Sequence, residues 1–207
     1  LTARGAEVTG LSRRDGLDLT DEASLAAAAS RLAAPFELIV NAAGALGIDG
    51  HGPERRLSEI SADTMAAQFA LNATGMALAV KHFSPLLGGP RPVFAGLTAR
   101  LGSIGDNHLG GWIAYRAAKA AANQILRTAS VELARTRPGR FGCVTRLGSQ
   151  AAGRRMSSAP GSIRTRMLCV GASRSPSTST RAGAESWTAT SPPRRSATRP
   201  SERPDSE

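Results

Sequence analysis

Few residues of this chain are suited to binding metals or forming disulfides. Only two cysteines and three histidines occur among its 207 residues. Cys143 and Cys169 have no close partner spacing, and the histidines form no ligand pair with them or with each other. The sequence therefore predicts neither a disulfide framework nor a zinc site.

Long apolar runs are also absent from the sequence. No uninterrupted run approaches the roughly 20 residues that span a bilayer. The start of the chain, residues 1–5, has neither an initiator methionine nor the apolar core of a signal peptide. We therefore expect a cytoplasmic protein without a membrane partner, and we expect that its N-terminus has been cut.

Lysine is rare, with 2 residues among 26 basic ones, and the charge is unevenly spread. Residues 1–145 carry 15 basic and 12 acidic residues, whereas residues 146–207 carry 11 and 4. The second stretch also holds 13 serines and 6 prolines without regular spacing, which is typical of disorder. We predict a globular domain over 1–145 and a basic low-complexity tail over 146–207. Nucleic-acid binding by this tail is the least favoured function.

Within residues 1–145, short apolar runs alternate with helical patterns. Strands are expected over 6–11, 36–40, 92–97 and 141–145. Helices are expected over 20–35 with Thr20 as N-cap, over 61–87 as one helix or two joined near Asn72, and over 112–135. Such alternation predicts an α/β fold with a mostly parallel sheet and helices on both faces. No element is expected beyond about residue 146.

The only tyrosine, Tyr115, stands four residues before Lys119 in the last expected helix. Positions i and i+4 share one face of a helix. A nearby cation favours the phenolate of a tyrosine, whose pKa is ordinarily about 10. We therefore expect an acid/base pair in which Lys119 lowers the pKa of Tyr115. The structural alternative is a core tyrosine beside a solvated lysine.

Further motifs accompany this pair in a fixed order. They are an Asn-Ala-Ala-Gly turn at Asn41, Ala42, Ala43 and Gly44, then Asn72, Ser103 and Tyr115-x-x-x-Lys119. This order and spacing resemble the short-chain dehydrogenase/reductase family. The stretch 101–107 with 110–112 resembles its C-factor-like subgroup. The resemblance covers about residues 1–145 and implies a Rossmann-like doubly wound sheet.

The family resemblance implies a role for each of these polar residues. Tyr115 would exchange a proton with a small carbonyl or alcohol substrate as hydride moves to or from a nicotinamide. Lys119 would also hold the nicotinamide ribose, and Ser103 would hydrogen-bond the substrate oxygen. Asn72 would support a bridging water near Lys119. The implied activity is that of an NAD(P)-dependent oxidoreductase.

The resemblance also implies where the cofactor lies. Basic residues after the first strand, Arg13 and Arg14, resemble those that meet the 2′-phosphate of NADP, although NAD remains possible. Asp18 and Leu19 resemble the pair that flanks the adenine, and the turn 41–44 would lie under the adenine ribose. The plainer interpretations are exposed loop charges and an ordinary turn after a strand.

The chain departs from the family pattern at both ends. The Gly-rich loop that approaches the pyrophosphate should precede Leu1, so we expect it to be missing and cofactor binding to be weak. After Thr145 the expected covering segment is replaced by the Arg/Ser/Pro-rich tail, for which a frameshift near Arg146 is our hypothesis. An inactive fragment is therefore one expectation.

A second class of function is a non-catalytic oligomerisation or signalling module. The expected helices 61–87 and 112–135 resemble those through which family members form homo-oligomers. Their many alanines allow two helices to approach closely. The substrate itself is not identified by any residue pattern in the chain.

Overall fold

The computed structural model describes residues 6–48, 50, 52–136, 142–144 and 166–171. The chain divides into two compact units, Leu1–Arg174 and Ser175–Glu207, and every described residue belongs to the first. Strands and helices alternate through this unit as expected, which confirms the α/β class.

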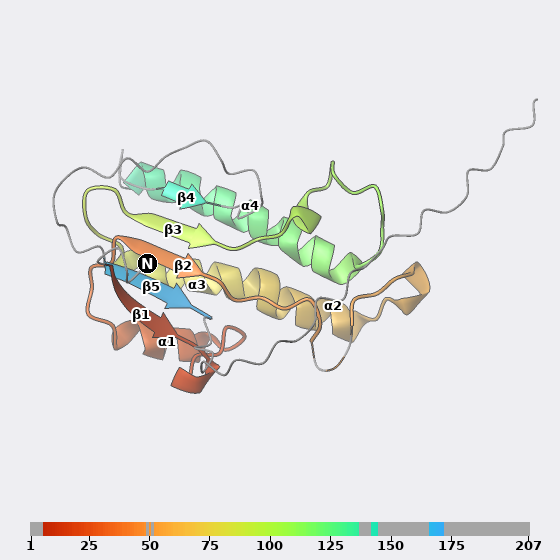
Figure 1. The fold of residues 1–207 in the computed structure, drawn as a ribbon, viewed down its shortest axis with the longest axis horizontal. Coiled ribbons are helices and arrows are strands. Elements are labelled where there is room, and N and C mark those ends of the chain that lie inside the picture. Colours follow the sequence, from red (N-terminus) through yellow and green to blue (C-terminus); the bar gives the residue numbers. More distant parts are fainter. Residues whose placement is uncertain (1–5, 49, 51, 137–141, 145–165, 172–207) are drawn as a thin grey trace, which may run out of the picture. The chain divides into compact units, whose positions relative to one another are not determined.

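Five strands form one parallel sheet (Figure 1). Their spatial order is β1, β5, β2, β3 and β4, and every neighbouring pair is parallel. Because the strands are parallel, their carboxyl ends meet at one edge of the sheet, where ligands of open α/β sheets bind. The bounds are β1 Glu7–Leu11, β2 Leu38–Asn41, β3 Val93–Gly96, β4 Gly142–Val144 and β5 Arg166–Val170.

Strand β5 corrects the expectation that no element follows residue 146. It lies between β1 and β2, with Leu168 in register with both Thr9 and Ile39. A short apolar run has no period of its own, so its pairing with two neighbouring strands, not its local pattern, makes it a strand. The compact unit thus passes the expected boundary at 145. The tail and frameshift expectations for 146–165 and 172–207 lie outside the described residues.

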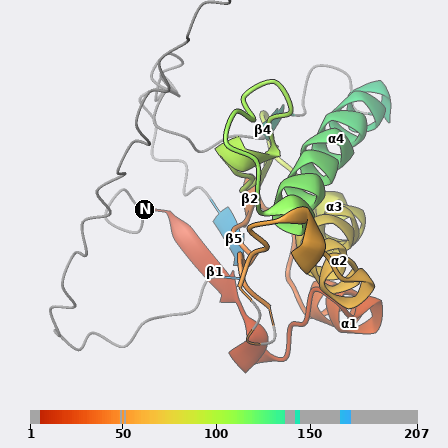
Figure 2. The same ribbon diagram turned by 90° about the vertical axis from the view of Figure 1, so that its right-hand side faces the viewer.

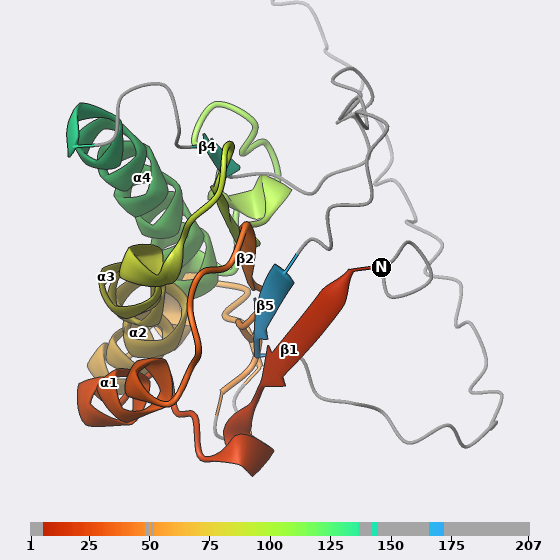
Figure 3. The same cartoon turned by 90° about the vertical axis from the view of Figure 1, so that its left-hand side faces the viewer.

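Four α-helices pack on the sheet, and Figures 2 and 3 show all four on the same face. We expected helices on both faces, whereas the helices of the described residues cover one. No helix in this described part of the chain is long and apolar enough to cross a membrane. The bounds are α1 Glu22–Ser30, α2 Ala62–Phe69, α3 Gly75–Phe83 and α4 Ile113–Thr136.

Two details of the helices are informative. The expected join near Asn72 is confirmed, because a π-helical segment, Ala70–Thr74, links α2 to α3. The expected N-cap of α1, Thr20, is wrong. The N-cap is Asp21, whose carboxylate accepts from the Ala23 N–H at 3.0 Å. The Thr20 hydroxyl instead donates to Asp18, a local bond that keeps it out of the cap.

The core lies between the helices and the covered face of the sheet. Ile39, Phe94 and Leu168 are fully buried there. At the end of β3, a Cβ on Gly96 would come within 2.6 Å of Leu126 Cδ1 and 2.9 Å of Met76 Sδ. The missing side chain therefore lets α3 and α4 pack closely over the strand ends, which brings their polar residues near the carboxyl edge.

Candidate active site

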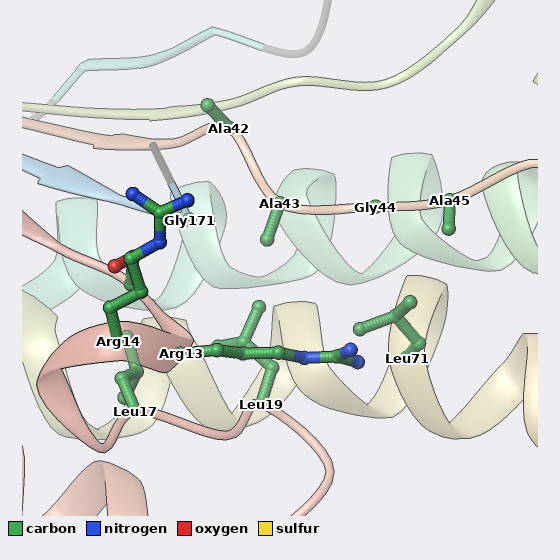
Figure 4. A pocket seen from close by; sticks show the side chains of 11 residues that line it. Arg13, Arg14, Leu17, Leu19, Ala42, Ala43, Gly44, Ala45, Leu71 and Gly171 are labelled. Carbon is green, nitrogen blue, oxygen red and sulfur yellow. The ribbon is translucent and has the colours of Figure 1, made fainter. Parts of the chain in front are cut away.

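A hollow of about 350 Å³ lies at the carboxyl edge of β1, β5 and β2, and we call it the cleft. The loops that follow these three strands form its walls (Figure 4). Its lining consists of Ser12, Arg13, Arg14, Leu17, Leu19, Ala42, Ala43, Gly44, Ala45, Leu71 and Gly171. Six of the ten residues expected to contact a cofactor therefore line one hollow.

Arg13 and Arg14 lie on a short 3₁₀ turn directly after β1. The turn is fixed by Asp15, whose carboxylate accepts from the Ser12 N–H at 2.8 Å and from the Ser12 hydroxyl at 2.7 Å. In Figure 4 the Arg13 side chain extends past Leu19 toward Leu71, and the Arg14 side chain extends toward β5. Two guanidinium groups thus give this wall a positive charge.

Of the expected cofactor-binding pair Asp18 and Leu19, only one residue lines the cleft. Leu19 lines the cleft and is almost fully buried. The Asp18 carboxylate instead accepts from the Thr20 N–H at 2.8 Å and from its hydroxyl at 2.7 Å. These hydrogen bonds lower the pKa of Asp18. Asp18 therefore shapes the loop and is not among the residues that line the cleft.

The turn after β2 forms the opposite wall. Ala42, Ala43 and Gly44 line the cleft, but Asn41 is buried beneath them. The Asn41 side-chain oxygen accepts from the Ala43 N–H at 3.1 Å, and its amide contacts Met76 Sδ at 3.3 Å. Asn41 thus holds the turn from below.

Asn72 fixes the same turn from the helix side. Its side chain donates to the Ala45 carbonyl at 3.0 Å and accepts from the Ala45 N–H at 3.3 Å. It also donates to Gln68 Oε1 at 2.7 Å, while Gln68 donates to the Leu46 carbonyl at 2.8 Å. The π-helical segment therefore places the buried side-chain amide of Asn72 where it satisfies the backbone N–H and carbonyl of Ala45. The expected water-bridging role of Asn72 remains a prediction.

Gly44 lies close to two of the catalytic residues expected from the sequence. A Cβ on Gly44 would lie 2.8 Å from both Asn72 Oδ1 and Lys119 Nζ. Its φ of +151° is also a conformation that other residues rarely adopt. Asn72 and Lys119, which come from different helices of the chain, thus meet at one glycine of the cleft wall.

Tyr115 and Lys119 lie together on α4, with Lys119 Nζ 5.7 Å from the centroid of the Tyr115 ring. The ammonium donates to the Leu97 carbonyl at 3.3 Å. The expected lowering of the Tyr115 pKa is not found: burial raises the pKa of Tyr115 and lowers the pKa of Lys119. Desolvation disfavours the charged form of each group, and it outweighs their mutual attraction.

Ser103 is exposed at the end of a 3₁₀ turn, Arg100–Gly102. A Cβ on Gly102 would lie 2.8 Å from the Lys119 carbonyl carbon and oxygen, and Asn123 donates to the Gly102 carbonyl at 3.3 Å. The loop before Ser103 is therefore packed against the turn of α4 that carries Lys119. This packing fixes the backbone next to Ser103 against the helix that carries Tyr115 and Lys119.

The start of α4 is set by an unusual backbone. Gly110, Gly111 and Trp112 have successive φ values of +66°, +65° and +55°. Trp112 N–H donates to the Glu54 carbonyl at 2.5 Å, and Arg116 Nε donates to the Gly111 carbonyl at 2.9 Å. Left-handed backbone at a non-glycine residue is costly and is retained mostly at functional sites. Here it orients the first turn of α4, which carries Tyr115.

Several site residues were missed by the sequence analysis. Gln68 stands four residues before Asn72, a spacing that places both on one helix face and could have indicated their bond. Gly171 directly follows the apolar run 167–170, and a glycine after such a run could have indicated the end of a strand. Leu17 and Leu71 had no such signal, because their place in the cleft depends on how separate elements pack.

The sequence model of one protein family, described as short chain dehydrogenase, matches residues 15–144. A curated relative, 1-hydroxy-2-glutathionyl-2-methyl-3-butene dehydrogenase of Rhodococcus sp. (strain AD45), is 31% identical over 119 residues, covering 56% of this chain and 50% of that protein. C-signal of Myxococcus xanthus is 35% identical over 101 residues, covering 48% and 57%. The chain thus spans about half the length of the curated relatives it matches.

Solved structures share the fold. A carbonyl reductase from Pseudomonas aeruginosa PAO1 matches with a TM-score of 0.54 at 21% identity, covering 69% of this chain and 71% of that chain. An NADPH-bound carbonyl reductase from chicken fatty liver matches with a TM-score of 0.52 at 24% identity, covering 61% and 53%. At these identities the likeness is one of fold alone.

Gly44→Ala should destabilise the protein by about 1–3 kcal/mol, because the new Cβ overlaps Asn72 Oδ1 and Lys119 Nζ and the backbone is strained. Gly105→Ala is the matched control, since a Cβ at Gly105 meets nothing within 4 Å. Urea unfolding of both variants measures the difference. Equal stability of the two would show that Gly44 is not a tight contact.

Burial of Lys119 predicts a pH-dependent stability. Its pKa is lowered by folding, so near and above that pKa the unfolded chain binds more protons than the folded one. The contribution of Lys119 to the free energy of unfolding should therefore rise as pH increases through its lowered pKa toward about 10, against the opposite contributions of Cys169 and Tyr115, whose pKa values burial raises. Lys119→Met should remove this rise, whereas the exposed Lys81→Met should keep it. Urea unfolding across this pH range measures the free energy of unfolding of each variant. If the free energy of Lys119→Met changes with pH as steeply as that of the wild type, the prediction is contradicted.

Proposed function

Because the chain belongs to the short-chain dehydrogenase family, we propose that it is an oxidoreductase that uses NADP to interconvert a small carbonyl compound and its alcohol. The observation that carries the proposal is that Asn72 Oδ1 and Lys119 Nζ both lie against Gly44, a residue of the cleft lining. Gly44 thereby links the cleft, which the arginine loop lines, to Lys119 of α4, although Lys119 and Tyr115 are not among the lining residues.

The residues of the cleft fit a dinucleotide that carries an extra phosphate. Arg13 and Arg14 offer guanidinium groups, which bind phosphate through charge-assisted hydrogen bonds, where an acidic residue would select NAD. Leu17 and Leu19 add apolar surface suited to a flat ring. The wall at 42–44 has only small side chains, so a ligand can approach its backbone closely.

The chain's own residues would then move the proton. Tyr115 would donate its phenolic proton to the carbonyl oxygen during reduction and take it back from the alcohol during oxidation. A raised pKa keeps this phenol protonated at neutral pH, which suits the reducing direction. Ser103 would hydrogen-bond the same oxygen, and Lys119 would donate to ribose hydroxyls beyond Gly44. The nicotinamide, when bound, supplies or accepts the hydride.

The names of the relatives support this chemistry. One curated relative is named as a dehydrogenase of an alcohol, and two solved neighbours are named as carbonyl reductases, one with NADPH bound. Because the chain spans about half of each curated relative, the activity and substrate remain our proposal for this chain.

Tyr115→Phe should lower the rate of NADPH-dependent carbonyl reduction by about 10²–10⁴-fold, because the proton donor is removed. Affinity for NADPH, measured by calorimetry, should change little. The matched variant Arg13→Ala should instead weaken NADPH binding while leaving NADH binding nearly unchanged. A Tyr115→Phe protein with full reductase rate would exclude Tyr115 as the acid. A wild-type chain without affinity for NADPH would exclude the cofactor.

Self-association is a second candidate function, favoured by a groove between α3 and α4. The groove has a volume of about 670 Å³, and its lining includes oppositely charged Lys81 and Glu132. Lys81 is already paired with Glu22 of its own chain. In a two-fold pair, Glu132 of one copy can join this ion pair on the other, with alanines between them. We propose a homo-oligomer formed through this groove. Its full lining is Ala77, Val80, Lys81, Ser84, Ala121, Gln124, Ile125, Thr128, Ala129, Glu132 and Leu133.

A charge placed inside the groove should separate the copies. Ala129→Glu should reduce the molar mass found by light scattering to that of one chain, because the longer, charged side chain would fill the space between the copies and would have to be desolvated there. Val131→Glu, at an exposed position of the same helix outside the groove lining, is the control and should keep the oligomer. A monomeric wild type would contradict the proposal, as would Ala129→Glu that stays oligomeric.

A further inference from the structure

Strand β5 lies between the two strands whose loops form opposite walls of the cleft. The arginine loop follows β1, and the turn at 42–44 follows β2. At its carboxyl end β5 is bonded to both sides: Gly171 N–H donates to the Leu11 carbonyl at 2.7 Å, and Ala42 N–H donates to the Val170 carbonyl at 2.9 Å. These two bonds span the base of the cleft.

We propose that β5 joins the two walls of the cleft and that Gly171 is a positioning residue of the cofactor site. Both lie outside residues 15–144, the part matched by the family. The proposal rests on the proposed cofactor function of the cleft. The proposal assigns part of the cofactor site to residues 166–171, which the sequence analysis placed in a low-complexity tail.

The position of the arginine loop depends on β5. In the sheet of described residues, β1 is an edge strand and β5 is its neighbour. Pairing runs from Glu7 with Arg166 to Leu11 with Val170, and Leu168 and Val170 are fully buried in the core. Removing this strand would leave the backbone groups of β1 without ladder partners and the arginine loop without a fixed distance to Ala43.

Gly171 controls how closely the walls approach. Its φ is +82°, and a Cβ there would lie 2.6 Å from Ala43 Cβ, 2.8 Å from Ala43 Cα and 2.9 Å from Ala43 N. Both Gly171 and Ala43 line the cleft. Backbone atoms cannot swing aside as the end of a long side chain can, so a side chain at 171 must displace the turn after β2 or the end of β5. Either movement changes the width of the cofactor site.

The role of β5 as the joining strand can be tested without a ligand. Hydrogen exchange of the wild-type chain, followed by mass spectrometry, should show protected amides in 7–11 together with 166–170. Because β5 is the neighbour of β1, protection of β1 requires that β5 be paired. Rapid exchange of β1 in a chain whose β2 and β3 amides are protected would overturn the proposal.

The role of Gly171 is tested by comparing Gly171→Ala with Gly10→Ala. Gly10 lies in β1 in register with Cys169, and a Cβ there meets nothing within 4 Å. We expect Gly171→Ala to lower Tm and to weaken NADPH binding at least tenfold, while Gly10→Ala matches the wild type in both. Gly171→Ala with wild-type Tm and affinity would overturn the assignment.

These measurements separate the two proposals. A wild-type chain that does not bind NADPH refutes the proposed function, while protection of β1 and the lower Tm of Gly171→Ala still support the joining role. A wild-type chain that binds NADPH, with Gly171→Ala binding equally well, leaves the proposed function standing and overturns the role of Gly171.

Discussion

The missing side chain at Gly44 is the constraint on which the site depends. Asn72 comes from the segment between α2 and α3, and Lys119 comes from α4, yet a polar atom of each lies 2.8 Å from the place of one absent Cβ. Gly96 and Gly102 allow similarly close packing, since a Cβ on Gly96 would clash with Leu126 of α4 and a Cβ on Gly102 with the backbone of Lys119 in α4. Close packing of backbone against helix therefore creates the geometry that the side chains use.

The polar groups in this packed region are stable because they bond to backbone. Asn41, Gln68, Asn72 and Lys119 are almost fully buried, and each has a hydrogen-bond partner in the turn after β2, in α2 and α3, or at Leu97. Burying an unpaired polar group costs several kcal/mol, so such groups persist where they are satisfied. The same bonds that lower this cost also fix the turn that lines the cleft, so stability and site geometry are coupled.

The sequence predicted the parts of the molecule that have a local signal. The helix α4, at 24 residues, shows its period clearly, and the Asn-Ala-Ala-Gly turn follows an apolar strand at the expected place. Strand β5 was missed because a five-residue run has no identity until two other strands flank it. The predicted pKa shift of Tyr115 was wrong for a related reason: the i,i+4 spacing shows that a lysine is near, but burial is decided by the whole fold.

The burial of Lys119 bears on the ligand-binding role that we propose for it. An ammonium group has three donors, and among the bonds of the described residues one is directed to the Leu97 carbonyl. The group lies beside Gly44 and over the Tyr115 ring, so its remaining donors are near the end of the cleft. A ligand that offers hydroxyl oxygens beyond Gly44 would supply acceptors to a cation that burial has left short of water. Binding would then offset part of the desolvation cost of Lys119, and the tyrosine beside it would stay protonated until a substrate oxygen takes its proton.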